Sequence, residues 1–175
     1  MPINQFEQTL SGGHPNSLGN TEQVVKEILR DKNKLQDLYD CYGSKDEVVR
    51  LRVSSAMKRV CKAHPDWVAE YLDRLIKDIS TIDQPSTKWT LAILFVLLNK
   101  HMSLEQRTEA IEVMKTNLLT ENDWIVQNTT AESLAYFAKR DNALMKWLIP
   151  ELEKMHHDSR KSISKRADKL LKVLD

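Results

Sequence analysis

The five histidines are the residues of this chain that most readily hold metal ions or transfer protons, and their positions disfavour both roles. His156 and His157 are adjacent, so on a helix their rings point about 100° apart and do not face one ion, as two histidines four residues apart would. His14, His64 and His101 are isolated from one another. The sequence therefore predicts neither a metal site nor a bound cofactor.

No combination of nucleophile, base and orienting group marks a catalytic site. The chain has no Gly-x-Ser-x-Gly motif, no glycine loop that could cradle a phosphate, and no pair of catalytic carboxylates. Long loops, on which catalytic residues usually lie, are also scarce. We therefore expect a protein that is not an enzyme and has no catalytic residues.

Two tryptophans are better candidates, and the chemistry that they favour is binding. At about 100° per residue, Trp67 lies about 120° from the apolar arc of a helix expected over residues 66–79, and Trp147 about 130° from that of a helix expected over 142–156. Tryptophan and arginine are favoured at binding hot spots. The alternative is that each ring packs against a neighbouring helix. The candidate partner-binding residues are Trp67, Glu70, Arg74, Lys77, Trp147 and Lys154.

A third tryptophan belongs to an apolar helix expected over residues 87–99. Trp89, Ile93 and Val96 lie opposite the main apolar face of this helix. A helix that is apolar all round is normally buried by its neighbours. The alternative is an exposed apolar patch through which the protein self-associates or binds a partner.

Length and composition indicate one helical domain without a membrane span. The chain has 175 residues but only 4 glycines, too few for the turns of a β-rich fold. The longest apolar run, residues 91–98, is far shorter than the roughly 18 residues of a transmembrane helix. The two cysteines form no C-x-x-C motif, and no signal peptide precedes them, which indicates free thiols in a cytoplasmic protein.

One apolar pattern recurs along the body of the chain. Its first position falls at Val49, Thr87, Val126 and Ile163, so successive copies are 38, 39 and 37 residues apart. We expect helices of this type to begin near residues 46, 85, 123 and 159. Second helices are expected over 66–79, 103–119 and 142–156, with Asp66 and Ser103 capping the first two. A shorter pair is expected over 20–30 and 32–41.

These helix pairs resemble HEAT repeats. Residues 46–50, Asp-Glu-Val-Val-Arg, followed by Ala56, are similar to the HEAT signature of an acidic residue, Val-Arg and small residues, and the later copies are looser. The resemblance covers nearly the whole chain and implies an all-α fold, a right-handed α-α superhelix of HEAT-like helical pairs. Residues 21–175 would form this single solenoid domain. Residues 1–20 would form either a flexible or loosely packed tail, or a segment that folds back on the first pair.

The resemblance implies a surface for a partner rather than an activity. In HEAT folds the second helix of each pair lines the concave surface, which would place Trp67 and Trp147 there. We therefore expect a non-catalytic protein–protein interaction scaffold that binds another protein. The alternative is a nucleic-acid-binding protein similar to HEAT-like DNA-repair proteins, which hold duplex DNA in a basic groove. A net charge of +1, from 26 basic and 25 acidic residues, counts against this alternative.

The last expected helix carries a stripe of lysines opposite its apolar face. A terminal repeat needs a polar outer face to stay in solution, which explains such a stripe without a ligand. The alternative is an edge that binds phosphate or acidic groups. The lysines of this stripe are Lys161, Lys165, Lys169 and Lys172.

Overall fold

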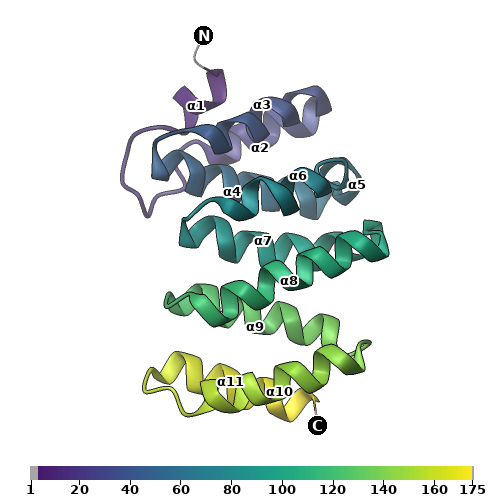
Figure 1. Ribbon diagram of the computed structural model, residues 1–175. Helices are drawn as coiled ribbons and strands as arrows, with labels where there is room; N and C mark the ends of the chain where they lie inside the picture. Colours follow the sequence, from purple (N-terminus) through teal and green to yellow (C-terminus); the bar gives the residue numbers. More distant parts are fainter. Residues whose placement is uncertain (1–3, 175) are drawn as a thin grey trace.

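The protein is built from helices throughout the part of the chain that the structure describes. In the computed structural model, which describes residues 4–174, eleven α-helices and four short 3-10 turns follow one another, and these residues include no β-strand. The helices stack in chain order from the N-terminal to the C-terminal end (Figure 1). The predicted all-α fold is confirmed for these residues.

Five helices form one row of the stack, which we call the first row. They are α2 (Thr21–Arg30), α4 (Glu47–Ala63), α7 (Pro85–Leu98), α9 (Trp124–Ala138) and α11 (Lys161–Leu174). Each helix of the row packs against the next one. The last four begin within two residues of the predicted positions. Local signals account for this agreement, since Asp46 and Asp123 cap α4 and α9 by accepting backbone N–H bonds.

The remaining helices, apart from α1, lie beside the first row, and we call them the second row. They are α3 (Leu35–Asp40), α5 (Pro65–Ala69), α6 (Leu72–Lys77), α8 (Leu104–Thr120) and α10 (Asn142–His156). The predicted capping box at the start of α8 is confirmed, because the Ser103 hydroxyl accepts the Gln106 N–H and the Gln106 side chain accepts the Ser103 N–H. The 3-10 turns are η1 (Lys32–Lys34), η2 (Cys41–Gly43), η3 (Ile79–Thr81) and η4 (Asn99–His101).

The helix predicted over residues 66–79 is wrong in two respects. It is divided into α5 and α6 by a turn at Glu70 and Tyr71, and Asp66 is not its N-cap. His64 occupies the cap position because Pro65, which lacks a backbone N–H, fits the first helical position. The turn coincides with burial of the Tyr71 ring, whose centroid lies 5.2 Å from that of Tyr39 on the preceding helix pair.

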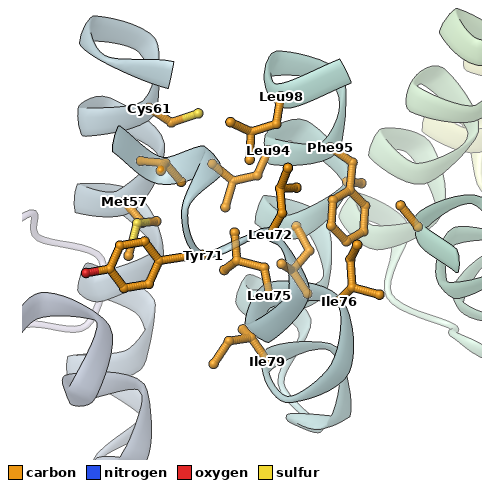
Figure 2. Close-up of a cluster of buried hydrophobic side chains, with 14 of the residues drawn as sticks. Met57, Cys61, Tyr71, Leu72, Leu75, Ile76, Ile79, Leu94, Phe95 and Leu98 are labelled. Atoms are coloured by element: carbon orange, nitrogen blue, oxygen red, sulfur yellow. The ribbon is translucent and has the colours of Figure 1, made fainter. Parts of the chain in front are cut away.

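A continuous apolar core lies between the two rows. Figure 2 shows the part of it where α4, α6 and α7 meet, with Met57, Leu72 and Leu94 among the buried side chains. The first residues of the repeated pattern, from Val49 to Ile163, are also buried. In the first-row helices that carry the repeated pattern, the face that the periodicity marks as apolar is therefore the face that neighbouring helices cover.

Polar side chains join equivalent positions of successive pairs. The Gln84 side chain binds Arg50 and the Glu47 carbonyl, 34 and 37 residues earlier in the chain. Arg160 binds Gln127 and the Asn122 carbonyl, 33 and 38 residues earlier. These separations are close to the repeat length of the sequence, so a similar contact is made at two steps of the stack.

The N-terminal segment packs against the first pair. Helix α1 (Gln5–Leu10) buries Phe6 and Leu10, and the following loop wraps around Arg52 of α4. Of the two arrangements expected for residues 1–20, the described residues 4–20 adopt the second, in which the segment folds back on the body. The first three residues lie outside the described part of the chain.

Candidate partner-binding surface

Trp67 is half-buried. A binding residue was expected to be exposed and a structural one to be buried, so Trp67 lies between the two expectations. It packs against the core from α5, and its ring stacks on that of His64 with centroids 3.9 Å apart and planes 8° from parallel. Part of the indole remains accessible to solvent. The residue therefore contributes to packing and remains partly accessible to solvent.

Arg74 and Glu70 mainly join their own helix pair to the preceding one. The Arg74 guanidinium lies over the rings of Tyr39 and Tyr71, 4.5 and 4.3 Å from their centroids, and donates to the Gln36 side chain. Glu70 accepts from Lys32 at 2.5 Å. Both residues were predicted as partner-binding groups, and the structure places them in contacts within the protein. Lys77, at the end of α6, is exposed.

Trp147 and Lys154 lie on α10, away from Trp67. The Trp147 indole is half-buried, with the Lys115 ammonium 5.1 Å from its ring centroid. Lys154 is exposed and pairs with Glu151 at 2.8 Å. Helix α8 lies between α6 and α10 (Figure 1), so the structure does not bring the two tryptophans into one cluster. The surface between them is that of α8.

Helix α8 is flanked on one side by a groove, which we call the α6–α8 groove. Its volume is about 500 Å³. Apolar groups from Ile76 and Val113 contribute to its walls, with Lys77, Glu109 and Glu112 among the lining residues. The groove therefore has apolar walls and more acidic than basic lining residues. Its one basic lining residue, Lys77, is among the predicted site residues.

A second hollow lies on the other side of α8, and we call it the Arg107 cleft. Its volume is about 550 Å³. Thr108 lines both hollows, so they meet on the surface of α8. The cleft lies where the N-terminal half of α8 faces the turn from α9 to α10. Its lining residues are Asn99, Leu104, Arg107, Thr108, Ile111, Tyr136, Phe137, Lys139, Arg140, Asp141 and Asn142.

The Arg107 cleft was not predicted from the sequence. Leu104 lies seven residues before Ile111 on the apolar arc of α8, and helical spacing predicts that it should be buried. It is instead 80% exposed, because no neighbouring helix covers it. Tyr136, on α9, is 43% exposed. Only the tertiary structure reveals that an apolar side chain is exposed although it lies on the arc that helical spacing predicts to be buried.

For Trp89, Ile93 and Val96 burial by neighbouring helices was expected, with an exposed self-association patch as the alternative, and all three are half-buried on the outer face of α7. Helix α7 is therefore not covered on all sides. Trp89 lines a smaller hollow of about 340 Å³ together with the N-terminal loop and α4. The helix thus retains an apolar strip on its outer face, and self-association through it stays a prediction.

The residues able to bind metals or act as nucleophiles are not gathered into a site. Among residues 4–174, no group of three or more His, Cys, Asp or Glu side chains could hold a metal ion. Cys41 and Cys61 are buried, and desolvation raises the pKa of each thiol to about 12, which keeps both protonated near neutral pH. None of the helices in this part of the chain has the length and apolarity needed to cross a bilayer.

Comparison of the chain with protein-family models and with curated proteins finds no match in either case.

Proposed function

We propose that this protein is a non-catalytic scaffold that binds another protein across α8. The two hollows that flank Thr108 support this proposal, because they lie on either side of one exposed stretch of α8 and each combines apolar with polar lining residues. Apolar contacts surrounded by polar groups are typical of protein interfaces. The half-buried Trp67 and Trp147 line neither hollow and would contribute to the edges of the interface rather than to its centre.

The same proposal includes HEAT-type helix pairs, a right-handed superhelical stack and a cytoplasmic location. Two observations support the repeat architecture. The helices of the first row follow the repeat of 38, 39 and 37 residues, and hydrogen bonds between polar side chains and the next pair span 33 to 38 residues. The buried free thiols agree with a reducing compartment.

A photo-crosslinking experiment tests the position of the partner. A photoreactive benzophenone side chain placed at Thr108, which is exposed, should give a discrete protein adduct in cells that contain the native partner. The same group at Ser162, an exposed position on α11, is the matched control and should not give this adduct. Excess unlabelled protein should compete for the partner, whereas excess protein with Thr108→Arg should compete poorly. Equal adducts from both positions, or none from Thr108, would contradict the proposal.

Nucleic-acid binding is a second candidate, and the distribution of charge favours it. The five helices of the first row contain 13 basic and 5 acidic residues, whereas α3, α5, α6, α8 and α10 contain 6 basic and 9 acidic ones. Lys58 and Lys62 lie on the outer face of α4, and burial together with Lys62 and Arg59 lowers the pKa of Lys58. The net charge of +1 counted against this candidate, but it is a sum over a basic first row and an acidic second row.

Gel-shift measurements with random duplex DNA test the second candidate. We expect binding at low salt that weakens steeply as salt increases. The double substitution Lys58→Glu and Lys62→Glu should weaken binding by roughly tenfold or more, since it reverses two phosphate-binding charges. Lys77→Glu with Lys154→Glu, on the second row, makes the same change in net charge and should have little effect. Equal losses from the two pairs would show that only net charge matters and that no nucleic-acid face exists.

A further inference from the structure

The Arg107 cleft combines an apolar base with an exposed apolar rim. Ile111 and Phe137 are buried side chains that contribute to its lining, and Leu104 and Tyr136 are among the most exposed large apolar residues of the described chain. The Tyr136 and Phe137 rings meet edge to face, with centroids 5.4 Å apart, which holds the aromatic wall in place. Such a cleft would gain stability by burying a bulky apolar side chain.

Three cations line the same cleft, and none of them is paired. Within residues 4–174, Arg107, Lys139 and Arg140 take part in no salt bridge, whereas Lys115 on α8 and Lys154 on α10 each have a glutamate partner. The only acidic lining residue is Asp141. Its Oδ1 accepts the N–H groups of two residues at the start of α10, at 3.0 and 2.9 Å, so it acts as a helix cap. The cleft therefore carries an excess of positive charge.

The hydrogen bonds of Arg107 are largely unfulfilled. A guanidinium has five N–H donors, and Arg107 makes one weak bond, from Nη2 to the Asn99 carbonyl at 3.3 Å. Its Nε is buried without a partner, and so is Oδ1 of the neighbouring Asn99. A buried donor without a partner costs free energy, which an arriving acceptor can recover after a small movement of the side chain. A carboxylate is well suited, since its two oxygens accept two guanidinium N–H bonds in one plane.

We infer that the Arg107 cleft binds an acidic segment of the partner protein in which Asp or Glu stands beside a bulky apolar residue. The inference rests on the proposed function and names the chemistry of the partner. The carboxylate would bind Arg107, with Lys139 and Arg140 around it, and the apolar side chain would cover Leu104 and Tyr136. Glu109, in the α6–α8 groove, would repel the same segment and so favour its binding on this side of α8.

Nuclear magnetic resonance titrations with short capped peptides test the inference on the full chain. The probes are acetyl-GDFDLG-amide, its neutral counterpart acetyl-GNFNLG-amide and the basic peptide acetyl-GKFKLG-amide. We expect the acidic peptide to shift backbone amide signals of residues 99–111 and 136–142, and to bind at least about tenfold more tightly than the neutral peptide, the factor expected for one charge-assisted contact. Phenylacetate, a free aromatic carboxylate, should bind more weakly than the acidic peptide.

Arg107→Gln should remove most of the preference for the acidic peptide, while Lys165→Gln, which removes an exposed cation from α11, should leave it unchanged. An unaltered spectrum away from the cleft shows that each variant is folded. Equal binding of acidic and neutral peptides, shifts outside the cleft, or phenylacetate binding as tightly as the peptide would overturn the inference. Preferential binding of the basic peptide in the α6–α8 groove would overturn it while leaving the scaffold proposal intact. Loss of the Thr108 adduct would instead contradict the scaffold proposal.

Discussion

Replacing Arg52 by leucine is expected to lower the free energy of unfolding by about 3–5 kcal/mol, because four backbone carbonyls lose their donor. Arg52 is 2% exposed although it carries a full charge. Its Nη1 donates to the carbonyls of Leu10 and Gly12, both at 2.6 Å. Its Nη2 donates to the His14 carbonyl at 3.1 Å and its Nε to the Ser17 carbonyl at 3.2 Å. No carboxylate in the described residues forms a salt bridge with it, so these carbonyls are what holds the buried charge.

Urea unfolding followed by far-UV circular dichroism measures this change. The matched control is Arg59→Leu on the same helix, because Arg59 is partly exposed and makes only a long contact of 3.9 Å with Glu22. That substitution should cost less than about 1 kcal/mol. Hydrogen exchange of the amides of residues 11–19 should also become faster in the Arg52 variant alone. Equal losses of stability from the two variants would show that the loop is not held by Arg52.

The Arg52 guanidinium lies so close to the backbone of the surrounding loop that one loop position favours glycine. Gly19 has a φ of +51°, in the left-handed region, and a Cβ added there would lie 2.8 Å from Cζ of Arg52. Any other residue at this position would therefore need a strained backbone conformation and a shift of the Arg52 guanidinium. The loop and the buried arginine form one structural unit.

Leu94→Ala is expected to destabilise the protein by about 2–5 kcal/mol, because it removes a buried side chain and leaves a cavity. Leu94 has no exposed surface, and it lies among the side chains of α4, α6 and α7 (Figure 2). The same urea measurement applies. Lys100→Ala, at an exposed position just beyond α7, is the control and should change stability by less than about 0.5 kcal/mol. A small effect of Leu94→Ala would mean that the Leu94 side chain does not face the core between α4, α6 and α7.

Asn99, next to Lys100, cannot serve as such a control, although helical spacing places it near the solvent end of α7. Its backbone carbonyl accepts from Arg107, its side chain contacts the Tyr136 hydroxyl at 3.5 Å, and its Oδ1 is buried. The position of a residue along a helix did not reveal that it lies at the edge of the Arg107 cleft.

The positions of most helices were predictable because they depend on residues close together in the chain. Ser103 and Gln106 form a capping box whatever surrounds them, and Asp123 begins α9 by the same local bonding. The repeated apolar spacing then identified the faces that would be buried. Local signals failed between α5 and α6, where burial of Tyr71 against the preceding pair accompanies a turn in the helix.

The candidate site depended on contacts between distant segments and could not be predicted in the same way. Arg52 is buried by residues 35 to 42 positions earlier, and no local pattern around it predicts this. Leu104 lies on the apolar arc of α8 but is exposed, since burial requires a neighbour as well as a face. The net charge of +1 likewise gives no information on which row carries the basic residues. The sequence by itself determined the helices and their apolar faces, because these follow from local bonding and periodicity. Only the tertiary structure decided which faces stay uncovered and which charges stay unpaired, because both depend on the packing of one helix pair against the next.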